Sequence, residues 1–168
     1  NGSVTIVGDT ATYQATLNYP NEESEGSDYF IYVVEDASST SNESRVEITV
    51  VGENDAPTAE NSEVTVSEDI KYIFEDDDFG YTDVDGDELR GISIASLPTL
   101  GSLYEGLTQI TGIDSSKVYS VSDLMYQTEL NSSESSSFEY YVYDGGLMSE
   151  TTYTMDIQVV TVNDIPIA

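Results

Sequence analysis

The sequence predicts an all-β protein made of two related antiparallel β-sandwiches, of which the N-terminal one is incomplete. Three observations indicate this. Apolar residues alternate with polar ones over many short segments, turn-forming residues separate these segments, and the chain repeats itself. Short strands that follow one another at intervals of about 8 to 12 residues are typical of a sandwich. Helical periodicity is nearly absent, apart from a turn expected at residues 120–125.

Two landmarks recur along the chain at nearly the same interval. The pattern F-x-Y-x-V-x-D begins at Phe30 and again at Phe138. The pair Asn54-Asp55, which precedes a proline, returns as Asn163-Asp164. The interval is about 109 residues in both cases, and two independent landmarks with one period indicate an internal repeat.

The repeat divides the chain into unequal parts. With this period, residues 58–166 form one full repeat. We expect the C-terminal half of a repeat at residues 1–53, a linker at 54–57, and a complete repeat that ends in the next linker at 58–168. Roughly fifty residues that would open the first repeat are absent from the sequence. Either the sequence is cut there, or another chain supplies the missing strands.

Each expected strand follows from a period-two pattern bounded by turn chemistry. Phe138, Tyr140 and Val142, for instance, alternate with more polar residues, and Asp-Gly and Leu-Pro pairs separate successive segments. In chain order, strands are expected at residues 4–7, 10–17, 30–35, 45–51, 63–66, 70–74, 89–95, 124–128, 138–143 and 151–160.

The composition excludes several classes of function. The chain has 168 residues, with no histidine for a hydrolytic triad or metal ligation and no cysteine for a thiolate, a disulfide or a structural zinc site. It carries 33 acidic and 4 basic side chains, a formal net charge of −29. Such a charge repels nucleic acid phosphates and anionic lipids, so we expect neither nucleic acid binding nor membrane insertion.

The same charge points to bound cations. Hydrophobic residues make up 38% of the chain, enough for a core, but the net charge favours disorder unless it is neutralised. Oxygen atoms are the metal ligands that this composition supplies, and they suit calcium or magnesium. We therefore expect the fold to depend on divalent cations.

Two sets of residues carry a resemblance to a known family. In the complete repeat they are Asp78-Phe79, Asp83-Val84-Asp85-Gly86-Asp87, Ile92-Ser93-Ile94, Leu97-Pro98, Gly101-Ser102-Leu103, the F-x-Y-x-V-x-D segment from Phe138 to Asp144, and Val162-Asn163-Asp164 with Pro166. In the half repeat they are Gly2-Ser3-Val4-Thr5-Ile6, Ala11-Thr12-Tyr13, the segment from Asp28 to Asp36, and Asn54-Asp55-Ala56-Pro57. This combination resembles the cadherin-like tandem repeats of large bacterial surface proteins, including the repeats-in-toxin adhesins.

The resemblance covers nearly the whole chain and implies a function. It implies tandem immunoglobulin-like (cadherin-like) β-sandwiches that calcium stiffens into an extracellular rod, which holds an adhesive tip away from the bacterial cell surface. Adjacent repeats of the same protein would be the partners. One departure is that Asp55 runs directly into Ala56-Pro57, whereas the cadherin linker has a further asparagine there. The number of ions at each junction is therefore open.

The expected calcium ligands follow from a simple topology. If seven strands alternate in direction in an immunoglobulin-like order, the second-to-third and sixth-to-seventh loops lie at the end where the chain enters. Carboxylates gathered there repel one another unless a cation with six to eight oxygen ligands joins them. The expected ligands are Asp83, Asp85 and Asp144 from these loops, Asn54 and Asp55 from the linker, Glu25 from the half repeat, and Asp87 as a weaker member.

A second, partial site is expected at the opposite end, and of two other readings of the acidic loop one remains open. The partial site comprises Glu68, Asp69, Asn163 and Asp164. Asp83 to Asp87 also fits a solvated Asp-Gly turn. An EF-hand does not fit, because counting from Asp83 places Glu88 and Ile94 where that loop needs glycine and glutamate.

The leading functional hypothesis is a non-catalytic, calcium-binding structural repeat of a secreted or cell-surface protein. The first alternative is a subunit of a homo-oligomer or filament, in which a neighbouring chain completes the half repeat by β-strand addition. The second is a carbohydrate-binding module that uses exposed tyrosines, of which the chain has 13 in all. Acid pairs spaced for glycoside cleavage carry little weight, since 33 carboxylates supply such pairs by chance.

Overall fold

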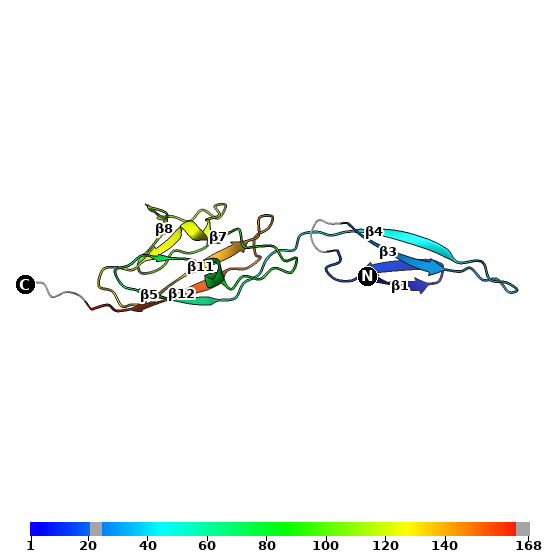
Figure 1. The fold of residues 1–168 in the computed structure, drawn as a ribbon, viewed down its shortest axis with the longest axis horizontal. Coiled ribbons are helices and arrows are strands. Elements are labelled where there is room, and N and C mark those ends of the chain that lie inside the picture. Colours follow the sequence, from blue (N-terminus) through cyan, green and yellow to red (C-terminus); the bar gives the residue numbers. More distant parts are fainter. Residues whose placement is uncertain (21–24, 164–168) are drawn as a thin grey trace, which may run out of the picture. The chain divides into compact units, whose positions relative to one another are not determined.

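The computed structural model describes residues 1–20 and 25–163 and shows a protein that is nearly all β (Figure 1). Asp164, which we expected in the second site, lies outside the described residues. Backbone contacts divide the chain into two compact units, Asn1–Asp55 and Ala56–Ala168. We call these unit 1 and unit 2 and describe each by itself. In the described part of the chain, no helix has the length and apolar character needed to span a membrane.

The described part of unit 2 contains two four-stranded sheets. The first has the order β5-β12-β11-β7 and the second the order β6-β10-β8-β9. Two short 3-10 helices accompany them: η1 lies between β6 and β7, and η2, where a turn was expected, lies between β9 and β10. The bounds are β5 Ser62–Ser67, β6 Tyr72–Ile73, η1 Asp76–Phe79, β7 Gly91–Ile94, β8 Ser102–Glu105, β9 Thr108–Gln109, η2 Val121–Asp123, β10 Leu124–Gln127, β11 Ser136–Tyr143 and β12 Tyr153–Val160.

The core of unit 2 lies between these sheets, and period-two alternation builds it. On β11, Phe138, Tyr140 and Val142 are buried, and the residues between them are exposed or half-buried. The other sheet contributes Leu103 from β8 and Tyr126 from β10. Each fully buried side chain of this size stabilises the fold by about 1.5–3 kcal/mol. The expected all-β character and the expected strands at 138–143 and 151–160 are confirmed.

One pairing differs from the expected antiparallel arrangement. β5 lies beside β12 in parallel, with Val64 opposite Ile157 and Val66 opposite Val159. The reason is topological: apart from the two-residue β9, the described part of unit 2 has seven strands, and when seven successive strands alternate in direction the first and the last run the same way and can pair only in parallel.

Two strands, β8 and β9, were missing from the sequence prediction. β8 pairs with β10 and with β9, so it lies inside its sheet rather than at an edge. Its four residues stand between Gly101 and Gly106, and this segment is too short to show a clear alternation. Its strand conformation depends on distant partners.

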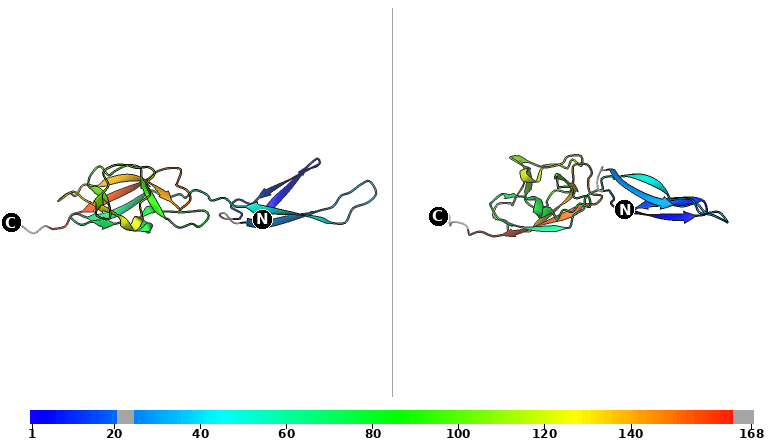
Figure 2. Two further views of the ribbon diagram at one scale, coloured as in Figure 1. Left: turned by 90° about the horizontal axis from the view of Figure 1, so that it is seen from above. Right: turned by 45° about the vertical axis from the view of Figure 1, so that its right-hand side comes forward.

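The described part of unit 1 forms two hairpins, each a two-stranded sheet (Figure 2). β1 Gly2–Val7 pairs with β2 Thr10–Ala15, and β3 Glu25–Tyr32 pairs with β4 Ser44–Val51. The Tyr13 hydroxyl of the first hairpin donates a hydrogen bond to Asp28 Oδ2 of the second at 3.0 Å. Among the described residues of unit 1, no large apolar side chain is fully buried.

Candidate cation site

The two acidic loops of unit 2 meet at the end where the chain enters the sandwich. The loop between β6 and β7 is held to the entering chain because Thr58 and Thr82 exchange two backbone hydrogen bonds of 2.8 Å. It is held to the loop that follows β11 because the Arg90 amide donates to the Tyr143 carbonyl at 2.8 Å. These contacts bring the segment that carries Asp83, Asp85 and Asp87 to the same end as Asp144.

The first loop curls around the side chain of Asp83. Asp83 Oδ1 accepts hydrogen bonds from the amides of Asp85, Gly86 and Asp87 at 2.8, 3.0 and 3.2 Å. Gly86 has φ +92°, a left-handed conformation that side chains rarely adopt, which explains the Asp-Gly pair at this turn. The turn leaves Asp85 buried, with 7% of its surface exposed.

The second loop uses Asp144 in a similar way. Asp144 Oδ1 accepts hydrogen bonds from the amides of Gly146 and Leu147, both at 2.6 Å. Gly145, with φ +113°, turns the chain between Asp144 and these two amides. Asp144 is buried, with 5% of its surface exposed. Each loop therefore orders its own backbone around one carboxylate oxygen.

Two polar atoms at this end are buried without a partner. Among the described residues, neither Asp83 Oδ2 nor the Tyr81 hydroxyl oxygen has a hydrogen-bond partner. A buried polar group left unpaired costs about 1–3 kcal/mol, and more if it is charged. Such groups are rare in native proteins and call for an ion or water that satisfies them.

The carboxylates at this end act on one another electrostatically. The pKa of Asp87 is raised, first by burial and then by the negative charges of Asp83, Asp144 and Asp85. The pKa of Tyr81 is also raised, again by burial first and then by three carboxylates of this end. Arg90 opposes both shifts. We call Asp83, Asp85, Asp87 and Asp144 the upper acidic cluster.

The donor chemistry of the upper acidic cluster suits a hard cation. Calcium takes six to eight oxygen ligands, often from carboxylates and backbone carbonyls together. The unpartnered Asp83 Oδ2 and the mutual repulsion of the cluster are the two observations that a bound cation would explain. As the side chains stand, however, the described residues contain no group of three or more acidic side chains poised to hold a metal ion. Metal binding would thus require the carboxylates to turn.

The remaining ligands expected for the same calcium site as the upper acidic cluster belong to unit 1. Glu25 is exposed and lies opposite Val51, so it stands at the end of its hairpin where residues 52–55 leave. Asn54 is half-buried and Asp55 is exposed. Their part in the site stays a prediction.

The second expected site lies at the other end of unit 2, where its carboxylates already accept hydrogen bonds from backbone amides. Glu68 is buried at 4% exposure, and its Oε1 accepts a hydrogen bond from the Val162 amide at 2.7 Å, next to Asn163. Asp69 has φ +63°, and its Oδ1 accepts from the Asn131 amide at 3.3 Å. Glu68 is thus bound directly to the exit segment, and Asp69 follows it in the chain.

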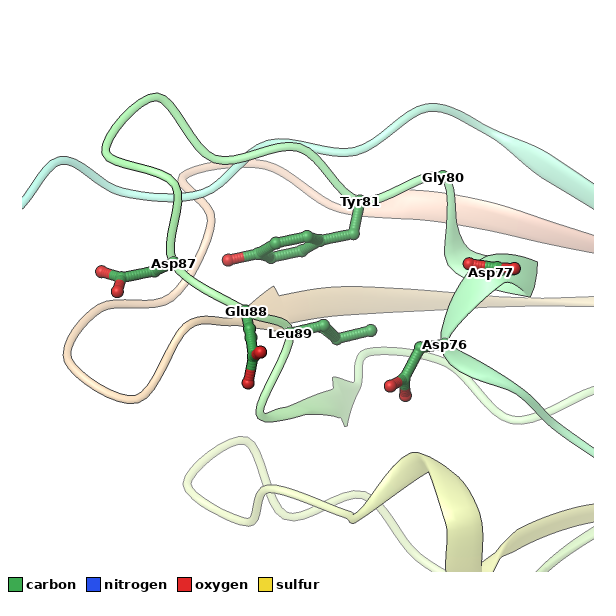
Figure 3. Close-up of a pocket in the computed structure, with 7 residues that line it drawn as sticks. All are labelled: Asp76, Asp77, Gly80, Tyr81, Asp87, Glu88 and Leu89. Atoms are coloured by element: carbon green, nitrogen blue, oxygen red, sulfur yellow. The ribbon is translucent and has the colours of Figure 1, made fainter.

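Sequence reasoning did not find Tyr81 or the depression beside it. An open depression of about 470 Å³ is lined by Asp76, Asp77, Gly80, Tyr81, Asp87, Glu88 and Leu89 (Figure 3). The Tyr81 ring reaches across the loop, with its hydroxyl toward the segment that carries Asp87. Its position two residues before Asp83 was the available signal, because residues two apart in an extended chain face the same side.

Comparisons with known proteins give few matches. No protein-family model and no curated protein matches the chain. Two solved structures of the endo-fucoidan hydrolase MfFcnA4 from glycoside hydrolase family 107, one of them a point variant, are similar at 16% and 17% sequence identity. Each match covers 97% of this chain but only 23% of the hydrolase, with a TM-score of 0.38.

Proposed function

We propose that this protein is a non-catalytic, calcium-binding structural repeat of a secreted or bacterial cell-surface protein. Calcium would bind within the upper acidic cluster and fix the two loops against each other. The observation that carries the proposal is Asp83 Oδ2, a buried carboxylate oxygen without a partner among the described residues, in a cluster with three further carboxylates.

The charge of the chain supports this proposal. With 33 acidic against 4 basic side chains, a compact fold has to hold like charges together. A ligand that binds only the folded state stabilises it by RT ln(1 + [L]/Kd), about 2.7 kcal/mol at a hundredfold excess over Kd. Extracellular calcium modules bind with Kd of about 10⁻⁴–10⁻³ M, so millimolar calcium would fill them.

The strand order supports the immunoglobulin-like part of the proposal. Apart from the two-residue β9, seven strands that alternate in direction, with the last strand between the first and the sixth, bring the two acidic loops to one end. In this proposal the adjacent repeats of the parent protein are the partners, and cations stiffen the repeat without any chemical reaction.

The test is the effect of calcium on thermal unfolding, measured with EDTA, with calcium and with magnesium. We expect calcium to raise the Tm of unit 2 and magnesium to do so much less, because magnesium demands a stricter octahedral geometry. Asp83→Asn and Asp144→Asn should each remove most of the calcium effect.

Asp114→Asn is the matched control for this experiment. Asp114 is exposed, and its Oδ1 also accepts a backbone hydrogen bond, from the Ser116 amide at 3.0 Å. It therefore shares the turn chemistry of Asp144 without belonging to the upper acidic cluster. The calcium response should survive in this variant. The proposal fails if millimolar calcium leaves the Tm of the unaltered chain unchanged, or if Asp114→Asn removes the response equally.

A further inference from the structure

The second hairpin of unit 1 repeats a hairpin of unit 2 in the same register. Phe30 on β3 lies opposite Val46 on β4, and Phe138 on β11 lies opposite Met155 on β12. The sequence repeat relates Phe30 to Phe138, and nearly the same interval relates Val46 to Met155. Hairpin β3-β4 is thus the counterpart of β11-β12.

The first hairpin of unit 1 has its counterpart in the other sheet of unit 2. Tyr13 on β2 lies opposite Val4 on β1, and Tyr126 on β10 lies opposite Leu103 on β8. In both units a Gly-Ser pair stands directly before the apolar residue that faces the tyrosine. Hairpin β1-β2 therefore matches the pair β8-β10.

The tyrosine hydroxyls make the same backbone contact in both units. The Tyr13 hydroxyl oxygen lies 3.5 Å from the carbonyl oxygen of Asn1, and Tyr126 donates to the carbonyl of Leu100 at 2.9 Å. Asn1 and Leu100 each stand immediately before the glycine of the Gly-Ser pair. Asn1 is thus the counterpart of Leu100.

A contact that joins the two hairpins is also repeated. The Asn1 nitrogen lies 3.1 Å from Asp28 Oδ2, and the Leu100 amide donates to Ser136 Oγ at 3.1 Å. Asp28 stands two positions before Phe30, and Ser136 stands two positions before Phe138, so the sequence repeat relates these residues as well. The match therefore extends across both hairpins.

What differs between the units is the cover on the apolar face. Tyr140 and Val142 of unit 2 are fully buried, whereas their counterparts Tyr32 and Val34 in unit 1 are 42% and 63% exposed. In unit 2 the cover comes from residues 56–99, which supply β5, β6, η1 and β7. Among the described residues of unit 1, no strand takes their place.

The strand edges of unit 1 show the same difference. In unit 2, β12 pairs with β5, β11 with β7, and β10 with β6. The corresponding edges of β4, β3 and β2 pair with no further strand among the described residues. Open edges with exposed apolar side chains beside them are a template for an added strand.

We propose that unit 1 is an acceptor for a polypeptide segment with the chemistry of residues 56–99 of this chain. The segment would add one strand parallel to β4 and others antiparallel to β3 and β2. Its alternating apolar residues, equivalent to Val64 and Val66 on β5 and to Ile92 and Ile94 on β7, would cover the exposed face. The interface is one that the chain already forms within unit 2. This inference goes beyond calcium binding and does not depend on it.

A second copy of the chain fits this face less well. Its unit 1 offers the same two hairpins again, with no counterpart of β5 or β7 among the described residues, and its residues 56–99 are already paired within its own unit 2. Self-association is therefore an alternative outcome of the test.

The test places the segment where the matched contacts of Asn1 and Leu100 predict it. Because Asn1 is the counterpart of Leu100, residues 56–99 are fused directly ahead of Asn1 in the full chain, and a peptide of residues 56–99 is added to the unaltered chain in parallel. Amide hydrogen exchange on β3 and β4 is measured in EDTA, so that calcium plays no part. The control fusion carries serine at the positions of Val64, Val66, Ile92 and Ile94.

We expect the fusion to slow exchange on β3 and β4 by about tenfold or more and to reduce binding of the apolar dye ANS. The control fusion should do neither. Equal exchange in fused and unaltered chains, or equal protection by the control fusion, would overturn the proposal. Protection of the unaltered chain that grows with its own concentration would overturn it in favour of self-association. A failure here leaves the calcium response of unit 2 unaffected, and the reverse also holds.

Discussion

Tyr126 covers Gly101 so closely that a Cβ atom on the glycine would lie 2.4 Å from the tyrosine hydroxyl oxygen. Gly101 also has φ +74°, in the left-handed region. Two independent demands, space and backbone conformation, therefore select glycine at the start of β8. The same close approach occurs in unit 1, where a Cβ on Gly2 would lie 2.4 Å from the Tyr13 hydroxyl oxygen.

This relationship predicts that Gly101→Ala destabilises unit 2 strongly. The left-handed backbone costs an alanine about 1–2 kcal/mol, and the displaced tyrosine adds a further packing loss of about 1–3 kcal/mol. Gly106→Ala is the control, because Gly106 has φ +58° but nothing within 4 Å of its Cβ position. Chemical denaturation of both variants measures the difference. Equal losses would show that the ring of Tyr126 yields without cost.

Two buried tyrosine hydroxyls should respond in opposite ways to removal. The Tyr81 hydroxyl is buried and has no partner among the described residues, whereas Tyr140 donates to the Phe79 carbonyl at 3.1 Å. In EDTA, Tyr81→Phe should leave the free energy of unfolding unchanged or raise it by up to about 1 kcal/mol. Tyr140→Phe should lower it by about 1 kcal/mol. Chemical denaturation measures both, and a clear loss of stability in Tyr81→Phe would mean that an ordered water satisfies the hydroxyl.

The pKa of Asp87 gives a pH-dependent prediction. Burial and the charges of Asp83, Asp144 and Asp85 raise this pKa above its ordinary value of 3.8 in the folded state. The folded chain therefore binds this proton more tightly than the unfolded chain does. The resulting stabilisation is complete below pH 3.8 and is lost as the pH rises through the folded-state pKa.

NMR titration of the carboxyl groups measures this directly. In EDTA the Asp87 midpoint should lie above 3.8, and Asp83→Asn should lower it by removing a like charge. Calcium should bring the midpoint below 3.8, because a bound cation favours the carboxylate. Asp114 is the control: hydrogen bonds from Ser116 lower its pKa, and calcium should not move it. A midpoint for Asp87 that is insensitive to calcium contradicts cation binding in the upper acidic cluster.

Local pattern was enough to predict much of this fold. The alternation at Phe138, Tyr140 and Val142 predicted a strand with one buried face, and its repetition at Phe30 predicted the matching hairpin. The loops that carry Asp83 and Asp144 could be placed at one end from strand direction alone. These features depend on residues close in sequence or on simple alternation of direction.

Features that depend on distant contacts could not be predicted. Strand β8 has four residues, and its place inside a sheet comes from β10 and β9. Parallel pairing of β5 follows from which edge it reaches. Asp83 Oδ1 accepts hydrogen bonds from its own loop, and this side-chain conformation leaves Oδ2 buried. Residue types alone do not determine such a conformation.

The buried side chain of Glu68 leads to a prediction about what stabilises the segment that follows β12. Its Oε1 accepts the Val162 amide at 2.7 Å just after β12 ends, so Glu68→Ala leaves that amide unpaired beside a new cavity. We expect this variant to lower the free energy of unfolding by about 1–3 kcal/mol and to speed exchange of the Val162 amide. Glu68→Gln keeps an oxygen acceptor and should lose less. Glu63→Ala is the control, since Glu63 is exposed and accepts from the Gln158 side chain at 3.3 Å rather than from a backbone amide. Unchanged exchange at Val162 in Glu68→Ala would show that the hydrogen bond from Glu68 does not stabilise the exit segment. The burial of Glu68 would then favour a role in the second expected cation site.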